Sequence, residues 1–231
     1  MNIPAKKFKS ILNNTTRFKK ISYKNYCATF DANFCSGKET EFIDSLESLI
    51  STGLHIKGDK TTSVIIANYA GRKIVIKKYH DKGFIHAIRH AIKGSRAQKN
   101  LYFANLLPLL NIKTANILLC LENRKLLFTR ESYIVMEYIE GPHLREFLQS
   151  KDIDKSQKQQ EILKAQTLFD KLTSYNITYS DPKLANLIIH DNQIYIIDLD
   201  SMLYHKIPLI FKFKSHKTIK KFNQRIAQQT L

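Results

Sequence analysis

Residues 179–200 read YSDPKLANLIIHDNQIYIIDLD, and the spacing of their polar side chains is the most informative pattern in the chain. Asp181 is followed five residues later by Asn186, and Asn186 is followed twelve residues later by Asp198. Carboxylate and amide oxygens are ligands that hard cations such as Mg²⁺ prefer in proteins. The spacing therefore suggests a site in which three oxygen-bearing side chains act together.

Two apolar runs separate Asn186 from Asp198. They cover residues 187–189 and 194–197, and the polar residues 190–193 lie between them. Short apolar runs on either side of a polar turn predict two antiparallel strands. Such a hairpin would bring the three oxygen-bearing side chains to one side of a cleft.

The composition is that of a globular protein rather than a disordered one. The chain has 231 residues, of which 43% are hydrophobic, enough for one large domain or for two small lobes around a cleft. Its three cysteines are an odd number without ligand-type spacing, which argues against a disulfide framework or a zinc site. We therefore expect a protein of a reducing cytoplasm, without a secretory signal or a membrane span.

Positive charge is concentrated at the two ends of the chain. The formal net charge is +17, and residues 1–30 and 201–231 each hold seven Lys or Arg and no acidic residue. The two ends thus supply 14 of the 17 charges. Basic ends of this kind predict an anionic partner, which is a membrane surface, a phosphorylated glycolipid or nucleic acid.

Hydrophobic periodicity and turn residues predict the order of the other elements. Helices are expected over 39–52, 84–93, 95–107, 144–148 and 162–172. Strands are expected over 64–66, 73–77, 116–121, 126–128 and 133–139, with a turn at 122–124. Strands therefore dominate the first half of the chain, and helices precede the hairpin.

This order resembles that of the bilobal protein-kinase fold, which ends its active site on an Asp-Asn-Asp hairpin. The expected fold class is α+β, with an antiparallel N-lobe sheet and a reduced, mainly helical C-lobe. One kinase-like domain would span 1–231, with the N-lobe over 1–138 and the C-lobe over 139–231. The chain departs from the pattern at Tyr179, where kinases have His, at Asp200, where they have Gly, and in lacking a Gly-rich loop.

The resemblance implies that the sheet binds ATP. Lys77 ends the strand that faces the nucleotide, where its ammonium would pair with the α and β phosphates; otherwise it is a solvated strand-end lysine. Asn100 stands near the position of the Glu that orients this lysine, or is a helix-surface amide. Met136, Glu137 and Tyr138 would form the hinge, with Met136 behind the adenine, or they are merely core-strand residues.

The resemblance also assigns roles around the hairpin. Asp181 would take the proton of the acceptor hydroxyl, and Lys183 would neutralise the transferring phosphoryl group. Asn186 and Asp198 would hold Mg²⁺. The alternatives are a turn-capping Asp181 and a solvated Lys183, and they leave the offsets of Asn186 and Asp198 unexplained.

Four features point to a narrower family. They are Ser180-Asp181-Pro182 with Asn186, the strand 196–199, the hinge 138–141 and the Lys-rich C-terminus. In this combination the chain resembles the lipopolysaccharide core heptose(II) kinases, relatives of the Kdo and heptose(I) kinases. The resemblance implies ATP-dependent phosphorylation of an inner-core heptose at the cytoplasmic face of the inner membrane of a Gram-negative bacterium.

The basic termini would then hold the protein peripherally on the anionic membrane surface. Apolar residues between Leu209 and Ile226 alternate with lysines, which suits an interfacial element or a terminal helix packed on the lobe.

Other functions remain open. The same fold could phosphorylate an aminoglycoside-like or other small metabolite, although such kinases present acidic pockets and this chain is basic. It could also be an inactive kinase-like scaffold, because the orienting Glu, the His and the Gly-rich loop are missing. A nucleic-acid partner is not expected, because no zinc-finger spacing or RNA-binding signature accompanies the charge.

Overall fold

The computed structural model describes residues 17–59, 61–80, 95–125 and 128–230. The basic helix expected at 84–93 lies outside these residues, as do the first basic residues of the chain. The chain divides into two compact units. The sheet unit contains the described residues up to Leu106 together with Asn116–Tyr138, and the helical unit contains Leu107–Ala115 and the described residues from Ile139 onward.

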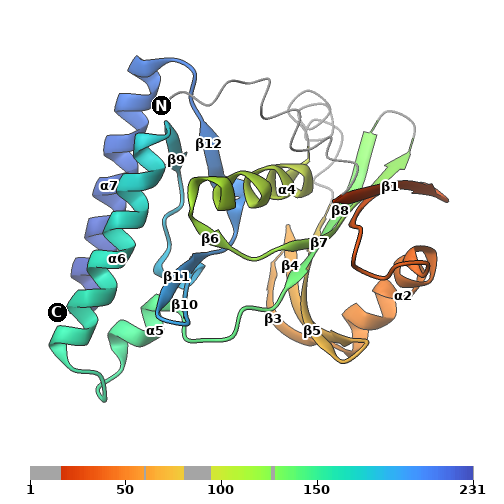
Figure 1. The fold of residues 1–231 in the computed structure, drawn as a ribbon, viewed down its shortest axis with the longest axis horizontal. Coiled ribbons are helices and arrows are strands. Elements are labelled where there is room, and N and C mark those ends of the chain that lie inside the picture. The colour runs from red at the N-terminus through yellow and green to blue at the C-terminus, as the bar shows by residue number, and fades with distance from the viewer. Residues whose placement is uncertain (1–16, 60, 81–94, 126–127, 231) are drawn as a thin grey trace. The chain divides into compact units, whose positions relative to one another are not determined.

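The sheet unit is built on a seven-stranded antiparallel sheet with the order β1-β2-β7-β8-β5-β4-β3 (Figure 1). Its strands are β1 (Phe18–Tyr23), β2 (Tyr26–Asp31), β3 (Leu54–Asp59), β4 (Thr62–Tyr69), β5 (Arg72–Tyr79), β7 (Ile117–Lys125) and β8 (Phe128–Glu137). Helices α2 (Glu39–Thr52) and α4 (Arg96–Leu106) pack on the sheet. The bounds of α2 are those predicted, and the Ser95 hydroxyl caps α4 by accepting a hydrogen bond from the Gln98 amide (3.1 Å).

Strand β5 shows how the two faces of the sheet differ. Ile76 is fully buried in a core cluster shared with α2. Because successive side chains of a strand point to opposite faces, Lys77 projects from the face opposite α2. Tyr79 shares that face, and its hydroxyl accepts a hydrogen bond from the Asn100 amide of α4 (3.0 Å). Helix α4 therefore packs on the face that carries Lys77.

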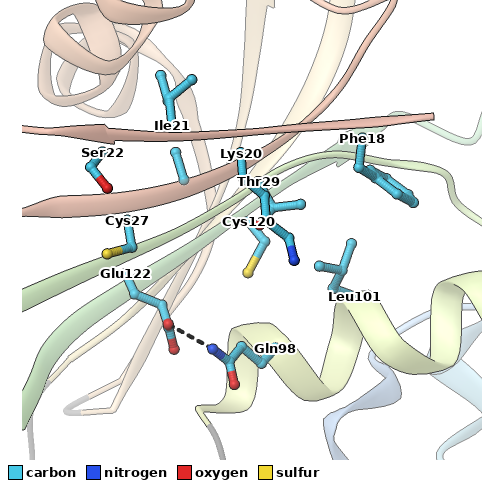
Figure 2. Close-up of a pocket in the computed structure, with 11 residues that line it drawn as sticks. Phe18, Lys20, Ile21, Ser22, Cys27, Thr29, Gln98, Leu101, Cys120 and Glu122 are labelled. Carbon is cyan, nitrogen blue, oxygen red and sulfur yellow. Dashed lines mark hydrogen bonds between the residues drawn. The ribbon is translucent and has the colours of Figure 1, made fainter. Parts of the chain in front are cut away.

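The sheet differs from expectation mainly at one edge. Strand β7 runs through 122–124, where a turn was predicted, and β1 and β2 at this edge are not among the predicted strands, nor is β3 at the opposite edge. Glu122 is 4% exposed, and its Oε2 accepts a hydrogen bond from Gln98 Nε2 (2.7 Å), so its polarity marks a contact with α4 rather than a turn. Figure 2 shows this pair beside a cavity of about 520 Å³ between α4 and strands β1, β2 and β7.

The helical unit combines long helices with short strands. Its described elements are the helices α5 (Leu144–Gln149), α6 (Lys155–Ser174) and α7 (Pro208–Thr230), the strands β6 (Lys113–Thr114), β9 (Ile177–Tyr179), β10 (Leu187–His190), β11 (Gln193–Ile196) and β12 (Met202–Tyr204), and the 3₁₀ turns η1 (Leu107–Leu110), η2 (Leu184–Asn186) and η3 (Leu199–Ser201). The strands form two small sheets, β10-β11-β6 and β12-β9. Helix α6 begins earlier than predicted because Asp154 caps it within the polar stretch, accepting a hydrogen bond from the Gln157 amide (2.8 Å).

Two local features fix the helical unit around its hairpin. The ring of Phe169 on α6 stacks on that of Phe222 on α7, with ring centroids 4.1 Å apart. Gly141 has a φ of +139° and lies so close to β10 that an added Cβ would collide with the carbonyl oxygen of Ile189. Across the described residues, no helix combines the length and the apolar character needed to cross a bilayer.

Candidate active site

The predicted hairpin is present in the helical unit. Strands β10 and β11 pair antiparallel, from Leu187 opposite Ile196 to His190 opposite Gln193. The two central turn residues have positive φ (46° and 58°), which is typical of a tight two-residue hairpin turn. At the open end, the Ile197 amide donates to the Asn186 carbonyl (2.9 Å). The pairing therefore sets Asn186 beside the residue that precedes Asp198.

Tyr179 connects the two candidate metal ligands. Its hydroxyl accepts a hydrogen bond from Asn186 Nδ2 (2.6 Å) and is within donor distance of the carbonyl oxygens of Ile197 (3.1 Å) and Asp198 (3.2 Å). The side chain is fully buried. Because the amide nitrogen of Asn186 donates to Tyr179, its side-chain carbonyl oxygen is the atom of this amide that can coordinate a cation. The tyrosine that replaces the usual His thus orients Asn186 and the backbone at Asp198.

The backbone at Asp198 is unusual. It has φ 64° and ψ 58°, the left-handed region that a non-glycine residue adopts rarely and that Asp tolerates better than most. Turn η3 begins at the next residue. Uncommon backbone conformations of this kind cluster at functional sites, where the surrounding structure holds them. The hydrogen bond from Tyr179 to the Asp198 carbonyl is one contact that does so.

Asp181 is held by two cations. Lys183 Nζ lies 2.8 Å from its Oδ2, and Arg225 NH2 of α7 lies 3.0 Å from its Oδ1. Burial disfavours the charged carboxylate, but the hydrogen bonds from Lys183 and Arg225 outweigh it and lower the pKa of Asp181 below its usual value. The side chain keeps 39% of its surface exposed, so the ionised carboxylate is accessible to an acceptor hydroxyl.

Three carboxylates lie close enough to Tyr179 to influence its titration. Burial raises the pKa of Tyr179 well above its usual value, and the negative charges of Asp198, Asp200 and Asp181 raise it further. The tyrosine hydroxyl therefore remains protonated and can donate at every physiological pH.

The donor set fits magnesium better than a transition metal. Within the described part of the chain, His, Cys, Asp and Glu form no group of three or more that could hold a metal ion. A magnesium ion in a nucleotide site needs fewer protein ligands, because phosphates and water supply the remaining oxygens. Asn186 and Asp198 offer one amide oxygen and one carboxylate. The hydrogen bond that the Asn186 amide nitrogen donates to Tyr179 fixes the orientation of this amide.

Lys77 belongs to the sheet unit and is not a solvated lysine. It is only 6% exposed, although it ends an apolar stretch of β5. Its register partner on β8 is Ile134, and Val75 is paired with Met136, so Lys77 and Met136 project from the same face. The cavity of Figure 2 has neither of them in its lining and is separate from this part of the face.

Asn100 is not a helix-surface amide either. It is 1% exposed, and its amide nitrogen donates to the hydroxyl of Tyr79 and to the carbonyl of Arg96, both at 3.0 Å. Its side-chain carbonyl oxygen is the atom of this amide that accepts hydrogen bonds. Tyr79 and Lys77 are two residues apart on one strand face, so Asn100 lies on the lysine side of the sheet.

The hinge residues end strand β8, and their amide groups have partners. The Glu137 amide donates to the Asn116 carbonyl (3.1 Å), and the Tyr138 amide donates to the Lys73 carbonyl (3.4 Å). The Glu137 carboxylate also accepts bonds from the Asn116 amide and side chain (2.9 and 3.1 Å). An adenine base that used either amide group would have to displace its carbonyl partner.

Sequence reasoning missed Arg225 and the role of Tyr179. Arg225 lies 44 residues from Asp181 and was counted only as part of the basic C-terminus. No local pattern distinguishes it from the neighbouring lysines. Tyr179 stands where the kinase pattern has His, two residues before Asp181. This position was the only sequence signal that Tyr179 contacts the candidate site.

Comparisons with known proteins identify a family and a fold. Residues 18–206 match the model of a family described as lipopolysaccharide core biosynthesis protein (WaaY). No curated protein matches the chain. The fold is similar to that of a solved structure titled "WaaP in complex with acyl carrier protein", with a TM-score of 0.58, 13% identity and 88% of each chain covered. The expected kinase-like α+β fold class, with an antiparallel N-terminal sheet and a helical C-terminal part, is thereby confirmed.

Proposed function

The chain belongs to the WaaY family of lipopolysaccharide core biosynthesis proteins, and from this we propose that it is an ATP-dependent kinase of the inner-core heptose, with the second heptose as acceptor. The observation that carries the proposal is the link through Tyr179 between Asn186 and the backbone of Asp198. A scaffold without catalysis has no need for a buried hydroxyl that bonds the Asn186 amide and the backbone of Asp198 beside an ionised carboxylate.

The proposed reaction forms one O–P bond and breaks another. The heptose hydroxyl attacks the γ-phosphorus of ATP, its proton passes to Asp181, and the bond between the γ-phosphorus and the bridging oxygen breaks to release ADP. Lys183 neutralises charge that develops on the transferring phosphoryl group. Asn186 and Asp198 would hold Mg²⁺, which would neutralise charge on the phosphates of ATP.

The sheet unit supplies the nucleotide contacts in this proposal. Lys77 pairs with the α and β phosphates, and Asn100 accepts a hydrogen bond from its ammonium. Met136 lies behind the adenine, and the backbone of Glu137 and Tyr138 contacts its edge. If the adenine uses the amide groups of these residues, it displaces the carbonyl groups of Asn116 and Lys73 that they contact in this structure. The burial of Lys77 and Asn100 supports these roles, because neither side chain is a solvated surface group.

The role of Asp181 is tested by phosphoryl transfer to core oligosaccharide. Asp181→Asn keeps the shape of the side chain and removes the base, so turnover should fall by about 10²–10⁴-fold. Asp191→Asn is the matched control, because Asp191 lies in the hairpin turn with 85% of its side chain exposed. Undiminished turnover of Asp181→Asn would reject the assignment.

The nucleotide site is tested by thermal stabilisation with Mg-ATP. A ligand at 100 times its Kd stabilises the folded state by about 2.7 kcal/mol. Lys77→Met should lose this stabilisation, whereas Lys78→Met should keep it, because Lys78 faces the other way and pairs with Glu47 (2.9 Å). If Mg-ATP does not change the melting temperature of the wild-type protein, the result would favour the inactive kinase-like scaffold instead.

The acceptor is identified by mass spectrometry of the core oligosaccharide. A strain lacking the chain should lose one phosphate, and tandem fragmentation should assign it to the second heptose. Restoring the wild-type chain should restore the phosphate, and restoring Asp181→Asn should not. If the missing phosphate belongs to another sugar, that sugar is the acceptor instead of the second heptose. An unchanged core oligosaccharide would reject the proposed function.

Helix α7 supports the proposed attachment to an anionic membrane surface. Leu209 and Phe213 are 78% and 74% exposed, and together with Lys212, Lys217 and Lys220 they line one shallow groove. Lysines near an anionic surface contribute about 1 kcal/mol each, and exposed aromatic and aliphatic side chains insert at the interface. The protein would thus lie peripherally at the cytoplasmic face of the inner membrane.

Two of the described cations near the N-terminus are held in ion pairs. Lys19 pairs with Glu39 and Lys24 with Asp44, at 2.8 and 2.7 Å. These ammonium groups already have carboxylate partners inside the sheet unit. The membrane proposal therefore rests on α7, whose inner face packs through Phe222 as a terminal helix while its outer face remains exposed.

Vesicle flotation tests the membrane surface. Vesicles with phosphatidylglycerol should carry the wild-type protein, and neutral phosphatidylcholine vesicles should not. Phe213→Glu should abolish flotation, whereas Leu163→Glu on α6, where the native leucine is also exposed (60%), should not. Equal flotation of the two variants would show that the membrane does not bind this face of α7.

A further inference from the structure

Helix α7 contacts the loop of the candidate base at two points. Lys221 Nζ lies 3.4 Å from the Ser180 carbonyl oxygen, and Arg225 NH2 lies 3.0 Å from Asp181 Oδ1. Residues four apart share one face of a helix, so a single face of α7 reaches the loop. In Figure 1 this helix runs beside α6 at the C-terminal end of the chain.

The position of Arg225 on α7 is fixed by its apolar neighbours. Phe222 is fully buried and Ile226 is 8% exposed, and these two residues flank Arg225 in the sequence. The ring of Phe222 stacks on Phe169, which in turn stacks on Tyr179 with ring centroids 6.2 Å apart. The same aromatic stack therefore anchors α7 and the strand that leads into Asp181.

The guanidinium of Arg225 is not arranged as an ordinary surface ion pair. Its NH2 contacts Asp181, while its NH1 is buried and has no hydrogen-bond partner within the described residues. An unsatisfied buried donor on a charged group is unfavourable for folding. A residue kept at such a cost in stability is better explained by what it does to Asp181 than by stability alone.

We propose that Arg225 is a positioning residue for Asp181, so that the C-terminal helix forms part of the catalytic machinery. The inference rests on the proposed kinase function and adds a residue outside the stretch 18–206 that matches the family. Lys183 binds one carboxylate oxygen and Arg225 the other, which fixes the rotation of the carboxylate. Each oxygen still has a lone pair for the acceptor hydroxyl.

Several charged or titratable groups lie near the loop that carries Asp181, and Lys183 and Arg225 are the two that lower its pKa. Lys183 comes from its own loop, Arg225 and Lys221 come from α7, and Tyr179 comes from β9. Asp198 and Asp200 add negative charge in the same region. Removing Arg225 takes away a cation that lowers the pKa of Asp181, so that pKa should rise. A base must be ionised to act, so the acidic limb of the pH profile should move to higher pH.

The test compares Arg225→Met and Arg225→Lys with Gln224→Met, an exposed neighbour on the same helix. Arg225→Met should lower kcat by up to about 100-fold, as expected for a misplaced catalytic group, with little change in the KM for ATP. Its acidic limb should move to higher pH. Arg225→Lys should restore part of kcat, because it keeps a cation, and Gln224→Met should behave as wild type. A kcat and an acidic limb equal to wild type in Arg225→Met would overturn the proposal.

A second measurement separates this inference from the proposed function. Carbon-13 NMR titration of the Asp181 carboxyl measures its pKa without substrate, and this pKa reports the contact between Arg225 and Asp181. The pKa should be higher in Arg225→Met than in wild type and intermediate in Arg225→Lys. An unchanged titration would refute the contact even if the enzyme is active. Wild-type protein without kinase activity, but with the expected titration difference, would reject the proposed function and leave the link between α7 and Asp181 in place.

Discussion

Replacing Tyr179 by phenylalanine removes one hydroxyl from the interior of the helical unit and leaves the ring in place. The hydroxyl accepts from Asn186 Nδ2 at 2.6 Å and donates toward the carbonyls of Ile197 and Asp198 at 3.1 and 3.2 Å. The single proton is shared between the two carbonyls, so the change removes the equivalent of two hydrogen bonds. At about 0.5–1.5 kcal/mol each, the free energy of unfolding should fall by about 2 kcal/mol.

The loss should be visible in stability and in metal dependence. For a chain of this length, about 2 kcal/mol lowers the melting temperature by about 4–8 °C. Groups that orient a metal ligand typically account for about 10–100-fold in metal affinity or activity. The Mg²⁺ concentration for half-maximal phosphoryl transfer should therefore rise by about that factor, because Asn186 loses its support.

Tyr133→Phe provides the matched control. Tyr133 is also buried (1% exposed), and its hydroxyl donates to Glu47 (2.9 Å) within the sheet unit, whereas the candidate metal ligands belong to the helical unit. Both variants should lose stability, and Tyr179→Phe alone should change the Mg²⁺ titration. A Tyr179→Phe enzyme with the Mg²⁺ dependence of wild type would refute the idea that this hydroxyl orients Asn186.

Three further predictions concern stability and reactivity. Gly141→Ala should lower the melting temperature by more than about 4 °C, because its Cβ meets the backbone of β10, whereas Gly37→Ala, also at positive φ but with open space around it, should lower it less. Burial raises the pKa of the Cys35 thiol to about 11, so iodoacetamide at pH 8 should alkylate it about 100-fold more slowly than free cysteine, as peptide mass mapping would show. Phe222→Ala should lower the free energy of unfolding measured in urea by about 3–5 kcal/mol, because it opens a cavity against Phe169; a loss below about 1 kcal/mol would contradict the anchoring of α7.

The hairpin was predictable because its information is local. The alternation of apolar and polar residues over 187–197 encodes two strands, and the turn residues between them accept positive φ. The same holds for α2, whose amphipathic stripe and terminal Gly53 predict both of its ends. In both elements, residues that are close together in the sequence are enough to predict the structure.

The expected turn at 122–124 was wrong for a reason that no local pattern reveals. Polar residues in the middle of an apolar run are typical of a turn. Here Glu122 is paired with Gln98 on α4, a helix that precedes it by more than fifteen residues. A polar residue can occupy a buried strand position when another element supplies its hydrogen bond.

The residues of the candidate site also fall into two groups: those that sequence spacing identifies and those that only tertiary contacts reveal. Chain order and spacing are enough to propose Asp181, Asn186 and Asp198, and the fixed length of the hairpin sets Asn186 beside the residue that precedes Asp198. The hydroxyl of Tyr179 between two of them, and the guanidinium of Arg225 on the third, follow from the packing of α6, α7 and β9 around Phe169. Contacts between residues 44 positions apart depend on how helices pack, and packing is a property of the whole core rather than of any stretch of sequence.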